Sequence, residues 1–194
     1  MSTVQSQYVT NLSDQVIIPS QGNIIQVNYT RVDTITTFVY DYRANYGNTG
    51  IHPLSLTLNN VENPNHWVLC NWYLSGESNA ASNTTFIVLR NGSPISFTGS
   101  SGVGNASGAT YWNADQGTWY DGDDSTTPSS RKFCYIGRIG TTGDVSYEIS
   151  FRDSGAGSAT FYQNRAVSGA GQANYENGVS CGVIYEISSY NGWT

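Results

Sequence analysis

The strongest constraint in this chain is a series of short apolar or alternating runs, each closed by turn-forming residues. Nine runs of at most nine residues recur, at 24–30, 34–42, 53–58, 67–74, 84–89, 132–139, 145–151, 159–164 and 179–187. Short runs bounded by Gly, Asn, Pro, Asp or Ser are typical of β-strands. Strands at this spacing predict an all-β chain of antiparallel strands, folded as a two-sheet sandwich or jelly roll.

Composition and length agree with one β domain. The 194 residues include 21 Gly, 14 Tyr, 6 Phe and 5 Trp, a mixture poor in helix formers, and they suffice for one sizeable core. Residues 1–22 are polar apart from Val16-Ile17-Ile18, which Pro19 follows. We therefore expect an extended N-terminal arm at 1–22 and a sandwich domain at 23–194.

Charge argues against nucleic acid as a partner. Eight basic and 14 acidic residues give a net charge of −6, and no basic cluster is longer than Arg131-Lys132, whereas a phosphate-tracking site needs a positive stripe. The N-terminus lacks the pattern of a secretory signal, and no window approaches eighteen apolar residues. We expect synthesis in a cytoplasm and no membrane partner.

Two local patterns give testable detail. Asn91-Gly92 directly follows a predicted strand, which indicates a tight hairpin because both residues tolerate positive φ. Cys70 shares strand parity with Trp72, and Cys181 shares it with Tyr185, so both are expected to be buried thiols. No cysteine or histidine spacing typical of a metal site is present.

The stretch YWNADQGTWYDGDD, residues 111–124, concentrates aromatic and acidic side chains. Its aromatic residues favour either stacking on sugar rings or packing against the sandwich or a trimer contact; they are Tyr111, Trp112, Trp119 and Tyr120. A calcium-binding EF-hand starting at Asp121 fails, because Thr126 and Lys132 stand where Gly and Glu are needed. A non-standard calcium loop and a solvated acidic turn both stay open.

Catalytic patterns are weak. His52 and His66 lie beside turns without a hydrolase motif, and Glu148 and Glu186 are more typical of solvent-facing strand residues than of a glycosidase pair. We expect no enzymatic activity and no cofactor.

Two arginines close apolar strand segments: Arg90 ends FIVLR and Arg165 ends FYQNR. Each is interpreted either as a strand-end charge that guards an edge or as half of an intersubunit salt bridge.

Several segments resemble a known family. FIVLRNGSPI (86–95), SYEISFR (146–152) with ATFYQNR (159–165), and ANYENGVSCGVIYEI (173–187) are similar to the β-sandwich modules of tailed-phage virion proteins, especially those of cyanophages. VIIPSQGNIIQV (16–27) resembles the lead-in to that module. The chain departs from the family in the expanded stretch 109–124 and in Arg138-Ile139-Gly140, where Asp-Ser-Pro is usual.

The resemblance implies a jelly roll related to the C1q and tumour-necrosis-factor heads, assembling as a homotrimer on the virion exterior. Such modules occur as tail-fibre heads and as capsid cement or decoration proteins. Only about twenty residues precede the sandwich, with no coiled-coil or collagen repeat. We therefore expect a decoration protein that bridges capsomers on the outer capsid surface and binds the major capsid protein through Val16, Ile17, Ile18 and Pro19. The alternative is a receptor-binding fibre head that recognises host polysaccharide through 109–124.

Overall fold

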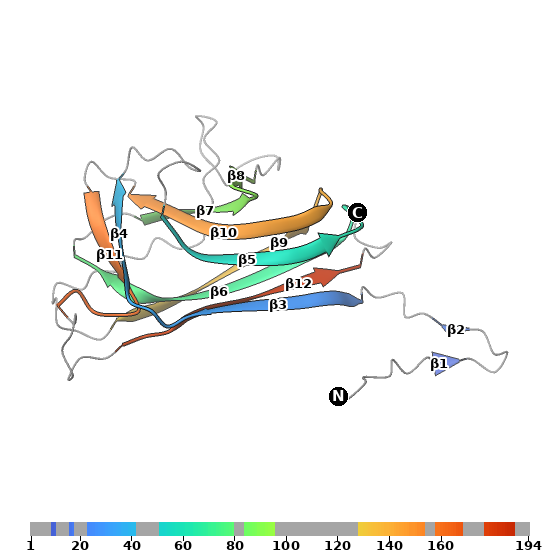
Figure 1. Ribbon diagram of the computed structural model, residues 1–194, viewed down its shortest axis with the longest axis horizontal. Helices are drawn as coiled ribbons and strands as arrows, with labels where there is room; N and C mark the ends of the chain where they lie inside the picture. The colour runs from blue at the N-terminus through green and yellow to red at the C-terminus, as the bar shows by residue number, and fades with distance from the viewer. Residues whose placement is uncertain are drawn as a thin grey trace.

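The computed structural model describes residues 9–10, 16–17, 23–41, 51–79, 84–95, 128–153, 158–168 and 177–188. These residues form two antiparallel sheets that lie face to face (Figure 1), together with a separate two-residue pairing near the N-terminus. In that pairing β1 (Val9–Thr10) runs antiparallel to β2 (Val16–Ile17). The described ranges contain no helix long and apolar enough to cross a membrane.

The smaller sheet has four strands in the order β5–β10–β7–β8. These are β5 (Ile51–Val61), β10 (Gly143–Asp153), β7 (Thr84–Arg90) and β8 (Ser93–Pro94). The predicted hairpin is confirmed: Asn91 and Gly92 join β7 to β8 with φ of 48° and 73°. Positive φ at both positions is what a two-residue hairpin turn requires.

The larger sheet has six strands, with β6 (Trp67–Ser78) at its centre. On one side of β6 lie β12 (Ser180–Ile187) and then β3 (Ile24–Val32). On its other side β9 (Ser129–Arg138) pairs with residues 67–76, and β11 (Ser158–Gln163) pairs with 76–78 and leads to β4 (Thr36–Asp41). β3 and β9 therefore border the long part of this sheet.

The core fills the space between the two sheets. Alternate side chains of β6 point inward and meet the inward side chains of β5 and β10; the main contributors are Val68, Cys70, Trp72, Leu74, Leu54, Leu56, Leu58, Val145, Tyr147 and Ile149. Each fully buried aliphatic or aromatic side chain contributes about 1.5–3 kcal/mol by leaving water. The predicted parity of Cys70 and Trp72 is confirmed.

The parity predicted for β12 is wrong. The residues of β12 that face inward are Ser180, Gly182, Ile184 and Glu186, and all four are buried. Cys181 is exposed on the opposite face, which also carries Val183 and Tyr185. Gly182 faces the core at a position where Leu56 fills the adjacent space. A Cβ added to Gly182 would stand 3.0 Å from Leu56 Cδ2, so a larger residue does not fit without a shift of its neighbours. The more apolar face of this strand points away from the core.

The nine predicted strands all exist, and the all-β prediction of two antiparallel sheets is confirmed. Most strands extend beyond the predicted apolar runs. β5 begins at Ile51 and ends at Val61, because backbone pairing with β10 continues to Val61 through the polar residues that follow Leu58. Pairing of the backbone does not require an apolar side chain.

Candidate functional site

The outward face of β3, β12, β6 and β9 is the candidate functional site. Antiparallel register sets its side chains in rows across the four strands. The rows run Arg31–Cys181–Tyr73–Lys132, Tyr29–Val183–Asn71–Cys134, Val27–Tyr185–Leu69–Ile136 and Ile24–Ile187–Trp67–Arg138. Among the described residues, nine large apolar side chains are exposed, and five of them stand in these rows: Ile24, Val27, Tyr29, Tyr73 and Ile136.

The two rows toward the end of β12 form the apolar half of the face. Val27, Tyr185, Leu69 and Ile136 make one uninterrupted apolar row. In the next row the guanidinium of Arg138 lies over the ring of Trp67, with its Cζ 5.2 Å from the ring centroid. Arg138 is exposed, so this contact places a cation at the border of the apolar half.

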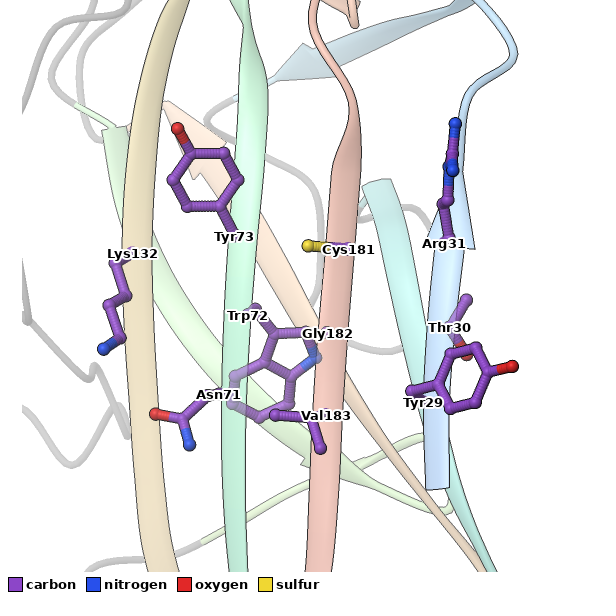
Figure 2. Close-up of a pocket in the computed structure, with 10 residues that line it drawn as sticks. All are labelled: Tyr29, Thr30, Arg31, Asn71, Trp72, Tyr73, Lys132, Cys181, Gly182 and Val183. Atoms are coloured by element: carbon purple, nitrogen blue, oxygen red, sulfur yellow. The ribbon is translucent and has the colours of Figure 1, made fainter. Parts of the chain in front are cut away.

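The other two rows form the aromatic–cationic half, which is hollowed into a groove of about 660 Å3. Figure 2 shows the small side chains of β12, Cys181 and Val183, between the larger side chains of the flanking strands. Tyr29 stands on β3 and Tyr73 on β6, and both rings are exposed, Tyr29 to 82%. The walls are two strand spacings apart, about 9.5 Å.

Charged groups lie on both sides of this groove. Arg31 lines it on β3 and Lys132 lines it on β9. Arg31 also contacts Asp33, with 3.6 Å between Nη2 and Oδ2, and both side chains are 64% exposed. Such an exposed pair is weak, so the Arg31 guanidinium can turn to another anion at little cost.

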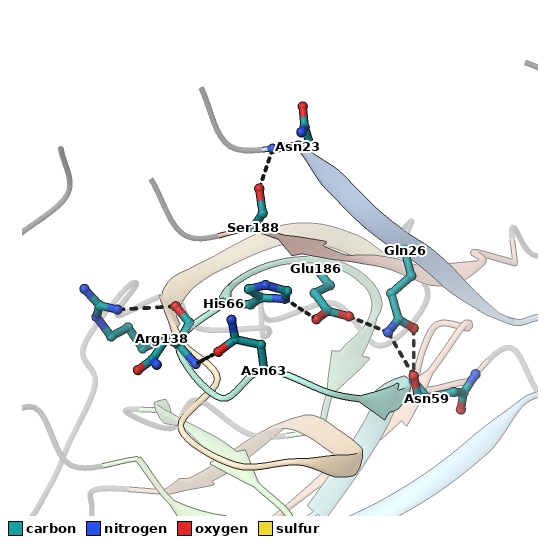
Figure 3. A network of polar contacts seen from close by, with 9 residues as sticks. Asn23, Gln26, Asn59, Asn63, His66, Arg138, Glu186 and Ser188 are labelled. Atoms are coloured by element: carbon teal, nitrogen blue, oxygen red, sulfur yellow. Dashed lines mark hydrogen bonds and ion pairs between the residues drawn. The ribbon is translucent and has the colours of Figure 1, made fainter. Parts of the chain in front are cut away.

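A polar network holds the end of the sandwich beneath the apolar half (Figure 3). Glu186 is 2% exposed, and its Oε1 lies 2.6 Å from Nδ1 of His66. Its Oε2 accepts a hydrogen bond of 2.5 Å from Nε2 of Gln26, whose amide also bonds the backbone N–H and carbonyl of Asn59. The expectation of a solvent-facing Glu186 is therefore wrong, because His66 and Gln26 satisfy its carboxylate inside the protein.

The cysteines divide between core and surface. Cys70 is buried, and burial, followed by the neighbouring Cys134, raises the pKa of its thiol well above the ordinary value of 9.0. Cys134 and Cys181 are exposed on the outward face and are free thiols. The expectation that Cys181 is buried is thus corrected. Thiolate rather than thiol is the reactive form, so Cys70 is the inert member of the three.

Both sequence-predicted arginines make contacts within this chain. Arg90 donates from Nη1 to the carbonyl of Ile139. Arg165 is buried, donates to the carbonyls of Ala166 and Val167, and lies with its Cζ 4.3 Å from the centroid of the Tyr162 ring. The intersubunit role considered for them stays a prediction.

The other predicted site residues are described only in part. Val16 and Ile17 form strand β2, whereas Ile18 and Pro19 lie outside the described residues. The aromatic residues Tyr111, Trp112, Trp119 and Tyr120 also lie outside them. The described residues contain no group of three or more His, Cys, Asp or Glu side chains placed to hold a metal ion.

Sequence reasoning missed the outward face. The signal was present in β12, where Cys181, Val183, Tyr185 and Ile187 alternate with Ser180, Gly182 and Glu186. Because the apolar side of a strand usually faces the core, the sequence predicted that Cys181 and Tyr185 point inward, whereas the structure places them on the outward face. Glycine and a carboxylate on the less apolar side looked like solvent-facing residues.

No protein-family model matches the chain, and a search of curated proteins finds no relative.

Proposed function

We propose that the chain is a structural protein of a phage virion: a homotrimeric cement or decoration protein on the outer capsid surface that stabilises the shell by bridging capsomers. One observation carries the proposal: the apolar half sets exposed apolar side chains side by side on four hydrogen-bonded strands, and we take it as the contact between copies of the chain. Contiguous exposed apolar surface on a rigid sheet is typical of a protein–protein contact.

The strand order supports the finer fold assignment. We assign the sandwich to the jelly-roll type: its eight strands are β5–β10–β7–β8 in one layer and β3–β12–β6–β9 in the other, and β11 and β4 are additional strands that extend the larger sheet from the end of β6. Eight strands in two such sheets are the jelly-roll pattern, which capsid proteins use widely. The assignment agrees with the resemblance of segments 86–95, 146–152, 159–165 and 173–187 to virion modules.

The arm supplies the contact with the shell. Residues Val16 and Ile17 already pair as a strand with Val9 and Thr10, and short strands of this kind add to exposed sheet edges of a partner. Three arms on one trimer multiply a modest affinity for the major capsid protein through effective concentration.

Labelling of intact particles tests the function. Gold-conjugated antibody against the chain is expected over the whole capsid surface. Label confined to the tail tip, or found only on free protein, contradicts the proposal. Deleting residues 2–20 is expected to leave a folded trimer that no longer adheres to capsids lacking the protein.

A further inference from the structure

A second binding surface adjoins the apolar half. We propose that the groove of the aromatic–cationic half binds an acidic polysaccharide, with sugar rings on Tyr29 and Tyr73 and carboxylates at Arg31 and Lys132. This activity goes beyond the proposed structural role and rests on different side chains. It is independent of the stretch 111–124, in which the sequence first indicated sugar binding.

The shape of the groove fits a chain of rings. Cys181 and Val183 are small, and Tyr29 on β3 and Tyr73 on β6 lie on opposite sides of them (Figure 2). The groove is open to solvent, so a long polymer can enter it sideways. Sugar rings have apolar C–H faces that pack on aromatic rings, and exposed tyrosines give such platforms at low entropic cost.

The hydrogen-bond donors that line the groove favour an anionic ligand. The polar groups that line the groove include the guanidinium of Arg31, the ammonium of Lys132 and the amide of Asn71, and no carboxylate is among the lining side chains. Arg31 and Lys132 are three strand spacings apart, about 14 Å. Two separated cations favour an anion that repeats along a polymer over a single small anion.

The net charge of the chain restricts where an acidic polymer can bind. The net charge is −6, and the chain has only eight basic residues, of which two border this one groove. An acidic polymer is repelled by such a protein except where cations gather. Guanidinium and ammonium groups bind carboxylates by charge-assisted hydrogen bonds, so the cations supply affinity while the tyrosines supply selectivity for rings.

Calorimetric titration of the 194-residue chain tests the proposal with two probes. Oligogalacturonate carries a carboxylate on every ring, and maltohexaose is a neutral chain of sugar rings. We expect oligogalacturonate to bind and maltohexaose to bind at least about tenfold more weakly. Binding should weaken as salt rises, since screening shortens the range of the Arg31 and Lys132 charges.

Variants locate the binding. Tyr29→Ala should weaken oligogalacturonate binding about fivefold to tenfold, and Tyr29→Phe, which keeps the ring, should bind as the parent does. Lys132→Gln should weaken it severalfold. Arg138→Gln is the matched control: it removes one charge from the same strand but outside the groove, and should leave binding unchanged.

Three outcomes overturn the proposal. They are no binding of oligogalacturonate, equal binding of both saccharides, or binding that Tyr29→Ala and Lys132→Gln leave unchanged. A synthetic peptide of residues 111–124, rich in aromatic and acidic side chains, serves as the third probe. If this peptide binds through Tyr29 and the saccharide does not, the groove is a peptide site.

Discussion

The two faces of strand β12 are built in opposite ways. Its inward face is Ser180, Gly182, Ile184 and Glu186, which is mostly polar or small yet buried, and its outward face is Cys181, Val183, Tyr185 and Ile187, which is apolar yet accessible. A strand of a free-standing sandwich normally shows the reverse. The inward face is determined by specific partners, and the outward face is free to serve contacts with other molecules.

The inward face depends most on the contact between Glu186 and His66. Replacing His66 with Ala leaves Oε1 of a buried carboxylate without its partner, so we expect the free energy of unfolding to fall by about 2–3 kcal/mol. Urea unfolding followed by tryptophan fluorescence measures this change. His66→Gln, which keeps a polar group near Glu186, should lose less, and an unchanged midpoint for His66→Ala would show that the contact is dispensable.

A charge placed in the apolar half is expected to weaken contacts made by the outward face. Ile136→Glu places a carboxylate in the row that contains Leu69 and Tyr185, and should weaken self-association at least about 100-fold because that charge must be desolvated on contact. Sedimentation velocity measures the effect. Ile35→Glu is the matched control, since Ile35 is 47% and Ile136 45% exposed, but Ile35 lies outside this face. Equal behaviour of the two variants would exclude the apolar half as a contact.

Adjacent positions on β12 separate the two faces directly. Gly182→Val forces a side chain against Leu56 Cδ2 and the Asn71 carbonyl, 3.0 and 3.1 Å from the added Cβ, and should cost about 1–3 kcal/mol. Cys181→Val points outward and should change stability by less than about 0.5 kcal/mol. Thermal unfolding of both variants tests the contrast, and similar losses at the two positions would contradict the assignment of faces.

The smallest expected effect is a pH dependence of the core. Burial raises the pKa of Cys70 above 9.0 and of Tyr135 above 10.0, so the folded protein holds these protons more tightly than the unfolded chain does. Stability from these groups is complete below about pH 9 and is lost as pH rises further. Cys70→Val should therefore move the onset of alkaline destabilisation up toward the tyrosine range. An onset that stays at the same pH in this variant would show that Cys70 is not responsible.

Much of the fold was predictable because strand runs and turn residues are local signals. The Asn91-Gly92 hairpin and the buried parity of Cys70 and Trp72 follow from backbone geometry and alternation. The orientation of β12 was not predictable in the same way. The roles of Gly182 and Glu186 depend on Leu56, His66 and Gln26, which are distant in the sequence.

The candidate site was least accessible to sequence reasoning. Tyr29, Tyr73 and Lys132 belong to three different strands, and only the register of β3, β12, β6 and β9 brings them to one groove. By contrast, residues 111–124 attracted attention because their aromatic and acidic side chains are neighbours in sequence. Proximity in sequence is a poor guide to a site assembled across a sheet.

The most direct test of the account is the mass of the 194-residue chain in solution across a range of concentrations. Because the apolar half is proposed to be the contact between copies, light scattering should give three times 21.1 kDa, falling to a single copy in Ile136→Glu. At about 1 mM, even a weak contact of about 4 kcal/mol would hold an appreciable fraction of the chains together. A mass of 21.1 kDa for the parent at every concentration up to that value would therefore contradict the proposed contact between copies.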